Sequence, residues 1–133
     1  MSLIFATLLL TGSGSDHAAA EAVKSFAAAG DRRDLEALDR VLHDEFRVSF
    51  VVKGTEKASV MSKSDYLGLA EAKKLGGDTR ALKVLNVDVQ DNLAFVRVRL
   101  VGKKATFESV QTVLKNGEDW KILGETVLFA PKG

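Results

Sequence analysis

Apolar and polar residues alternate along the C-terminal half of the chain, and this pattern predicts four consecutive β-strands. The alternation covers residues 79–90, 93–101, 105–115 and 119–129, with short polar turns between these ranges. Strands joined by such short turns pair with their neighbours as an antiparallel meander. Further upstream, the alternation over residues 46–52 predicts one more strand.

The N-terminal half shows helical spacing instead, in three segments. Ser15 or Asp16 can cap the first helix, which is expected to end at Gly30. Asp31 and Asp34 resemble a capping pair for a shorter second helix, and the capping sequence SKSD at residues 62–65 begins a third. Helices that precede a meander indicate an α+β domain with the helices on one face of the sheet.

The turn residues determine which side chains share a face of the meander. A two-residue turn at Asp91-Asn92 pairs apolar residues with one another on one face, so this face is expected to pack under the helices. A second turn, at residues 103–104, extends the same face to Ser109 and Gln111. The expected pairs on this face are Val89 with Ala94, Val87 with Val96, Leu85 with Val98, Val98 with Ser109, and Val96 with Gln111.

The last hairpin is expected to turn at the Asn-Gly sequence of residues 116–117, which is a strong hairpin signal. This register sets Gln111 opposite Ile122 and turns Thr126 inward. Glu125 then falls on the outer face, and the inner face carries no carboxylate. A slip of one residue would reverse these assignments.

Neutral polar groups interrupt the otherwise apolar inner face. Because buried polar groups need hydrogen-bond partners, Ser109 and Gln111 either satisfy each other and the backbone within the core or line a small pocket. The third alternative is that the expected register is wrong, so that these two side chains do not lie on the inner face. If there is a pocket, the candidate ligand-binding residues are Phe46, Phe50, Tyr66, Val98, Ser109, Gln111 and Trp120.

The outer face of the meander combines apolar and charged side chains. A half-apolar sheet face with charged borders suits an isologous homodimer better than open water. Arg99 lies opposite Glu108 in the expected register, but a surface ion pair contributes only ~0–1 kcal/mol, so orientation at an interface is its expected role. The candidate dimer-interface residues are Phe95, Arg97, Arg99, Val110 and Leu123.

Composition narrows the classes of function. The chain has 133 residues and a net charge of +1 without an extended basic run, so no nucleic-acid partner is expected. It has no cysteine, which removes disulfides, thiolate metal sites and a cysteine nucleophile. His17 and His43 lack metal-ligand spacing, so we expect neither a metal nor a cofactor. Without a linker or repeat, residues 1–133 are expected to form one domain.

Residues 1–15 form an N-terminal extension that has two interpretations. LIFATLLL followed by TGSGS has the apolar core and small-residue tail of a secretory signal, although no basic residue precedes Lys24. Its eight apolar-rich residues are far fewer than the ~20 that span a bilayer, so no membrane span is expected. The other interpretation is an edge strand over residues 3–10. The sequence leaves the cellular compartment undecided. The protein is cytoplasmic or, if residues 3–15 are a signal remnant, periplasmic or secreted.

Three stretches of the sequence, MSKSDYLGLAEAKKLGG, VLNVDVQDNLAFVRVRL and LKNGEDWKILGET, together resemble the nuclear transport factor two-like superfamily. This superfamily includes polyketide-cyclase-like and ketosteroid-isomerase-like proteins, and the resemblance covers about residues 17–129. Within it, the chain looks like the branch labelled putative lumazine-binding. The resemblance implies a cone-shaped, curved antiparallel sheet wrapped around about three helices, with a pocket at the wide end and sheet-to-sheet homodimers.

The resemblance also bears on activity. Catalytic members of the superfamily place an Asp, or an Asp with a His, inside the cone as a general base, and the lumazine-like branch often has an Asp near the position of Ser109. The first hypothesis for this chain is therefore a non-enzymatic, homodimeric module that binds a small apolar ligand or acts as an accessory domain. The alternative is an isomerase, dehydratase or cyclase, which requires an acid or base inside the cone.

Overall fold

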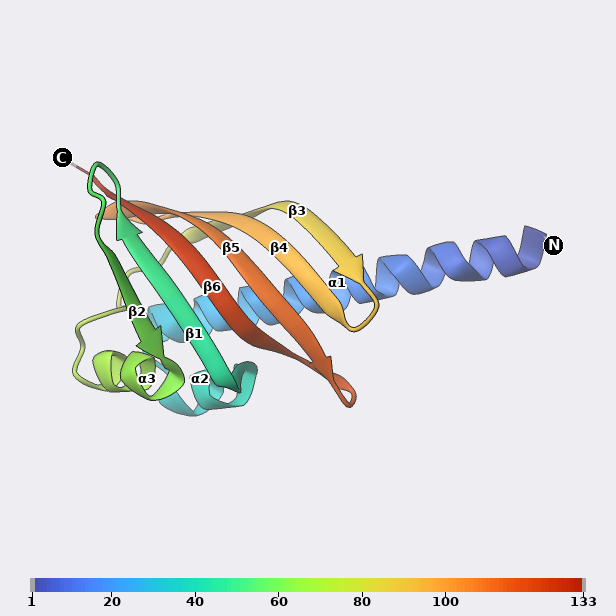
Figure 1. The fold of residues 1–133 in the computed structure, drawn as a ribbon, viewed down its shortest axis with the longest axis horizontal. Helices are drawn as coiled ribbons and strands as arrows, with labels where there is room; N and C mark the ends of the chain where they lie inside the picture. Colours follow the sequence, from blue (N-terminus) through green and yellow to red (C-terminus); the bar gives the residue numbers. More distant parts are fainter. Residues whose placement is uncertain (1, 133) are drawn as a thin grey trace.

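Three helices and one six-stranded sheet make up the fold (Figure 1). The structure, a computed structural model, describes residues 2–132, with side chains described from Gly14 onward. The elements are α1 (Ser2–Arg32), α2 (Leu35–Val41), β1 (Leu42–Val52), β2 (Ala58–Ser62), α3 (Lys63–Glu71), β3 (Ala81–Gln90), β4 (Leu93–Val101), β5 (Ala105–Asn116) and β6 (Asp119–Pro131).

The sheet is open and mixed. Its strand order is β2-β1-β6-β5-β4-β3, and every neighbouring pair is antiparallel except β1 and β6, which are parallel. The expected α+β cone is confirmed, because the sheet curves over α1 (Figure 1). One detail is corrected, because the sheet is not antiparallel throughout. The sheet also has two free edges, at β2 and β3, and does not close into a barrel. β1 and β6 run parallel because the chain crosses to the far edge of the sheet before returning with β6 beside β1.

Helix α1 is longer than the sequence pattern indicates. It begins at Ser2, so the backbone of residues 3–10 is helical. The interpretation of this stretch as an edge strand is therefore wrong. This stretch contains four leucines and no proline, and leucine is a good helix former. A short apolar run cannot be assigned to helix or strand from periodicity alone. No helix within the described part of the chain has the length and apolarity needed to cross a membrane.

The capping box of the third helix is confirmed, but the capping pair expected for the second helix is corrected, because Asp31 lies within α1 and Asp34 alone is the N-cap. Asp34 caps α2 by accepting a hydrogen bond from the backbone N–H of Ala37 at 3.1 Å. Ser62 and Asp65 form the reciprocal capping box of α3. Each cap satisfies backbone N–H groups that have no partner within the helix. The Ser62–Asp65 box therefore fixes where the chain leaves β2 and enters α3.

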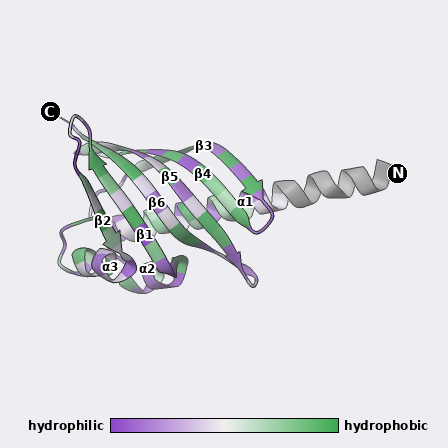
Figure 2. Ribbon diagram, in the orientation of Figure 1, coloured by the Kyte–Doolittle hydropathy of each residue, from purple (hydrophilic) through white to green (hydrophobic). Residues whose placement is uncertain are grey.

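The core lies between α1 and the concave face of the sheet. Hydrophobic and hydrophilic residues alternate along the strands (Figure 2), which leaves one apolar face toward the helices. Phe26, Phe46 and Tyr66 form a cluster of rings with centroid separations of 5.6–5.8 Å. Ala94, Val96, Val98 and Leu100 are the inward residues of β4, and all of them are buried.

The registers of the first two hairpins agree with expectation except at one bulge. Val89 pairs with Ala94 and Val87 with Val96, but Leu85 is an extra residue in β3, so that Val84 replaces it opposite Val98. The β4–β5 register is confirmed over its whole length, including Val98 with Ser109, Val96 with Gln111, and Arg99 with Glu108.

The last hairpin differs from expectation at two places. Asn116 pairs with Asp119, so the turn residues are Gly117 and Glu118. Farther along, Thr112 pairs with Gly124 but Val113 pairs with Ile122, which makes Leu123 the extra residue of a bulge in β6. A bulge exchanges the faces of all residues beyond it. Gln111 consequently pairs with Glu125, and Thr126 points outward and is exposed.

Candidate functional site

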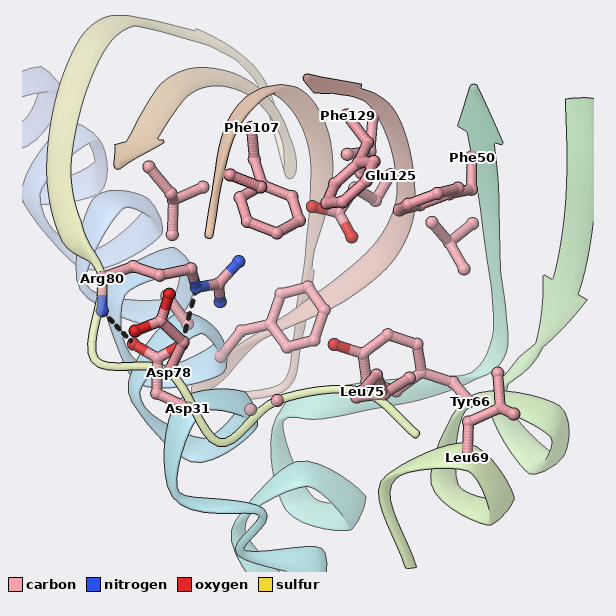
Figure 3. A pocket seen from close by; sticks show the side chains of 18 of the residues that line it. Asp31, Phe50, Tyr66, Leu69, Leu75, Asp78, Arg80, Phe107, Glu125 and Phe129 are labelled. Carbon is pink, nitrogen blue, oxygen red and sulfur yellow. Dashed lines mark hydrogen bonds and ion pairs between the residues drawn. The ribbon is translucent and has the colours of Figure 1, made fainter. Parts of the chain in front are cut away.

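A cavity of about 600 Å³ opens at the wide end of the cone. Its walls come from the C-terminal end of α1, from α3 and the loop after it, and from the inner faces of β1, β5 and β6. Apolar side chains make up most of the lining. Figure 3 shows that three polar groups, on Glu125, Tyr66 and Arg80, point into this space from different sides.

Glu125 is the polar residue on the sheet side of the cavity. The bulge at Leu123 turns it inward, opposite Gln111. The Ser109 hydroxyl donates a 2.6 Å hydrogen bond to Oε2 of Glu125, and Nε2 of Gln111 donates one to the same oxygen at 3.2 Å. The two neutral polar residues of β5 therefore serve as donors to a carboxylate. This overturns the expectation that the inner face is free of carboxylates.

Burial raises the pKa of the Glu125 carboxyl group above its ordinary value of 4.5. The hydrogen bonds from Ser109 and Gln111 and the positive charge of Arg80 act in the opposite direction, because they stabilise the ionised form. Removal from water is the largest of these effects. A carboxyl group whose pKa is raised in this way can exchange a proton nearer to neutral pH than an exposed glutamate can.

Arg80 is held at the edge of the cavity by Asp31. Asp31 lies in the last turn of α1 and Arg80 directly precedes β3, so the pair ties the helix to the sheet. Nε of Arg80 donates to Oδ1 of Asp31 at 2.6 Å, and both side chains are less than a fifth exposed. The guanidinium lies over the ring of Phe107, 4.8 Å from its centroid, which is a cation–π arrangement.

Tyr66 brings its hydroxyl group into the cavity from α3. Its ring packs against Phe26 and Phe46, and Gly30 leaves room beside its oxygen. Burial raises the pKa of the phenol, and the nearby charge of Glu125 raises it further. The phenol therefore stays protonated at neutral pH and can act as a hydrogen-bond donor.

The candidate ligand-binding residues named from the sequence separate into three groups. Phe50, Tyr66 and Gln111 line the cavity. Phe46 and Val98 are fully buried in the core, and Ser109 is buried where it holds Glu125. Trp120 lies elsewhere, in a shallow groove between α1, α2 and the β5–β6 turn.

Sequence reasoning missed Glu125 and Arg80, and a local signal existed only for the first. Gly124 interrupts the alternation of β6, and a glycine inside a strand often marks a bulge. The Asp31–Arg80 pair has no such signal, because its members are 49 residues apart in the chain.

Over the described residues, no group of three or more His, Asp or Glu side chains gathers in a way that could hold a metal ion.

An open curved sheet over three helices, with a cavity at the wide end, is the nuclear transport factor two-like (NTF2-like) fold. An NTF2-like protein of unknown function from Silicibacter pomeroyi matches with a TM-score of 0.77 and 20% identity, covering 89% of this chain and 98% of that chain. A second one, from Shewanella baltica, has a TM-score of 0.75 and 13% identity, covering 87% and 94%. A ketosteroid isomerase-like protein from Erwinia carotovora atroseptica has a TM-score of 0.67 and 16% identity, covering 86% and 95%. At these identities the likeness establishes the fold alone.

The family is established by the sequence itself. A family model described as "Putative lumazine-binding" matches residues 15–126, and the chain belongs to this family. No curated protein matches the chain. The expected superfamily and branch are thereby confirmed.

Proposed function

We propose that the protein binds a small, largely apolar molecule in the cavity at the wide end of the cone. The observation that carries this proposal is the combination of about 600 Å³ of space, an apolar lining and a few polar groups that converge on it. Binding sites for small molecules have this size and this composition. The polar groups would fix the orientation of the ligand, and the apolar walls would supply most of the binding free energy.

Filling the cavity tests this proposal. Gly30 lies in α1 beside the cavity, and a Cβ atom added there would lie 3.5 Å from Oη of Tyr66 and 4.0 Å from the nearer terminal nitrogen of Arg80. A leucine at this position therefore fits at its base and extends into the space that a ligand would occupy. We expect Gly30→Leu to weaken binding of the apolar fluorescent probe N-phenyl-1-naphthylamine by about tenfold or more, measured by fluorescence titration.

Gly68→Leu is the matched control, because it introduces the same side chain into helix α3. An added Cβ at Gly68 has no other atom within 4 Å, so probe binding is expected to stay unchanged. Leucine has a higher helix propensity than glycine, so neither substitution lowers the stability of its helix. Equal probe affinity in both variants, with thermal melting unchanged, would place the bound probe outside the cavity and contradict the proposal.

We also propose that the protein is a homodimer through the outer face of the sheet. Phe95, Val110 and Leu128 lie on adjacent strands of this face and are 39–46% exposed. On the same face, Oε2 of Glu108 is shielded from solvent yet has no hydrogen-bond partner within the described residues. A second copy packed against this face would cover the apolar side chains. Arg97 and Arg99 border them, and Leu123 follows at the bulge, so the interface proposed from the sequence is retained.

A single charge on this face is expected to separate the two copies. Val110 is central, paired with Arg97 on one side and Thr126 on the other. In an isologous dimer, Val110→Glu places two like charges near the interface, and we expect sedimentation velocity to report a monomer. Ala72→Glu introduces the same charge at an exposed residue that follows α3, on the helical side of the sheet, and should leave the dimer intact. A Val110→Glu protein that sediments like the unsubstituted chain would rule out this face.

Proton-transfer catalysis is a second candidate function, of the isomerase, dehydratase or cyclase type. One observation favours it: Glu125 is a carboxyl group with a raised pKa inside an apolar cavity. A group of this kind can remove a proton from a carbon next to a carbonyl group, and the Tyr66 hydroxyl can donate a hydrogen bond to the oxygen on which charge develops. The test of this candidate uses Glu125→Gln and is described in the Discussion.

A further inference from the structure

The sheet side of the cavity presents hydrogen-bond acceptors without matching donors. Both hydrogen bonds to Glu125 arrive at Oε2. Gln111 is only 2% exposed, and its Oε1 has no partner within the described residues. Turning its amide around would direct that oxygen at the carboxylate of Glu125, so the observed orientation is the favourable one. Oε1 of Gln111 is itself closed off from solvent, so Oε1 of Glu125 is the acceptor that a ligand in the cavity can reach.

The rest of the cavity lining carries an excess of positive charge. Arg33, Lys73, Lys74, Arg80 and Lys104 line the cavity, against the three carboxylates Asp31, Asp78 and Glu125. None of the three lysines belongs to an ion pair with any residue whose side chain is described. Arg80 is paired through Nε, and its terminal nitrogens point into the cavity (Figure 3).

A row of aromatic rings joins these two sides. Phe50, Phe129 and Phe107 come from the adjacent strands β1, β6 and β5, with ring centroids 5.3 and 5.2 Å apart. Aromatic faces favour flat, apolar partners. The cavity therefore combines an acceptor region, an aromatic wall and a cationic mouth.

We propose that the ligand is a flat, largely apolar organic anion with an O–H or N–H donor at the end opposite its carboxylate or other acidic group. The donor meets Oε1 of Glu125, and the anionic group lies among Arg80, Lys73 and Lys104. This inference rests on the proposed function, because it specifies which class of small molecule the cavity takes.

Three probes of similar size separate the two requirements. The probe 6-hydroxy-2-naphthoate has both groups, 2-naphthoate lacks the donor, and 2-naphthol lacks the anion. We expect the first to bind about tenfold more tightly than either of the others, measured by isothermal titration calorimetry near neutral pH. Similar affinities for all three, within about twofold, would overturn the proposed ligand class but leave the binding cavity standing. Failure of all three probes, and of N-phenyl-1-naphthylamine, would overturn the proposed function as well.

Substitutions assign each requirement to its side of the cavity. Glu125→Met keeps the approximate length of the side chain but removes the acceptor, so it should abolish the preference for 6-hydroxy-2-naphthoate over 2-naphthoate. Lys104→Gln should reduce the preference for 6-hydroxy-2-naphthoate over 2-naphthol. Its matched control is Lys103→Gln, because Lys103 is the neighbouring turn residue and does not line the cavity. An equal effect of Lys103→Gln and Lys104→Gln would mean that net charge alone attracts the anion, and would overturn the proposed site for it.

Discussion

Phe46→Ala is expected to lower the free energy of unfolding by about 3–5 kcal/mol. The side chain of Phe46 is fully buried. Its ring centroid lies 5.8 Å from that of Phe26 and 5.7 Å from that of Tyr66, with edge-to-face geometry in both pairs. Truncation removes apolar area from the core and leaves a space that the neighbours fill only in part. Urea denaturation followed by circular dichroism measures the loss.

The same substitution is also expected to weaken probe binding in the cavity. Phe46 supports the ring of Tyr66, whose hydroxyl points into the cavity, so the probe affinity of Phe46→Ala should fall even where the protein is still folded. Val60→Ala is the control for stability, because its side chain is 65% exposed and its loss should cost no more than about 0.5 kcal/mol. A Phe46→Ala protein as stable as Val60→Ala would contradict the ring cluster as the centre of the core.

Glu125→Gln is expected to lower the rate of proton transfer and to raise the stability of the folded protein at about pH 8. If Glu125 is a base, the chain exchanges the α-hydrogens of a bound cyclic ketone, such as 2-tetralone, with deuterated water faster than buffer does. Glutamine cannot accept the proton, so this added exchange should fall by about 100-fold or more. Proton NMR measures the rate of exchange. Glu108→Gln is the matched control, because Glu108 lies on the outer face of β5 and pairs with Arg99. An unsubstituted chain that adds nothing to the buffer rate would eliminate the second candidate function.

The stability effect of Glu125→Gln follows from the raised pKa of this group. The folded state holds the Glu125 proton more tightly than the unfolded state, whose pKa is near the ordinary value of 4.5. As pH rises from that value through the raised pKa of the folded state, ionisation favours the unfolded chain, and stability is lost. Glutamine does not ionise, so the variant avoids this loss. We expect it to be more stable than the parent at about pH 8, and the difference to disappear at about pH 4. The reverse order at pH 8 would mean that the carboxylate is stabilised more by its donors than it is penalised by burial.

The sequence predicted the β4–β5 region well because its turns and alternation act locally. The turn at residues 103–104 joins two strands of unbroken alternation, so counting outward from it places every residue of β4 opposite its observed partner in β5. Ser109, Gln111 and the Arg99–Glu108 pair were therefore placed on their correct faces. The register of a strand determines the face on which each side chain lies, as long as no extra residue intervenes.

The candidate site was harder to predict because its chemistry depends on two features that alternation does not encode. One is the extra residue at Leu123, which reverses the face of Glu125 and turns a neutral inner surface into one with a carboxyl group. The other is the long-range pair between Asp31 and Arg80, which forms only after α1 packs against the sheet. The N-terminal segment shows a third case, since an apolar run of that length suits either a strand or a helix.

The parallel pairing of β1 with β6 has a consequence for the order in which the protein is made. Leu42 and Ile122 are partners across this pair although 80 residues separate them in the chain. Closing so long a loop carries an entropic cost before any contact is gained, so this pairing belongs to the late steps of folding. During translation, a nascent chain that still has β6 inside the ribosome has neither the wall that bears Glu125 nor the strand that covers one edge of β1. The proposed ligand cavity therefore has all of its walls only once β6 has been made, and truncation before β6 would remove one of them.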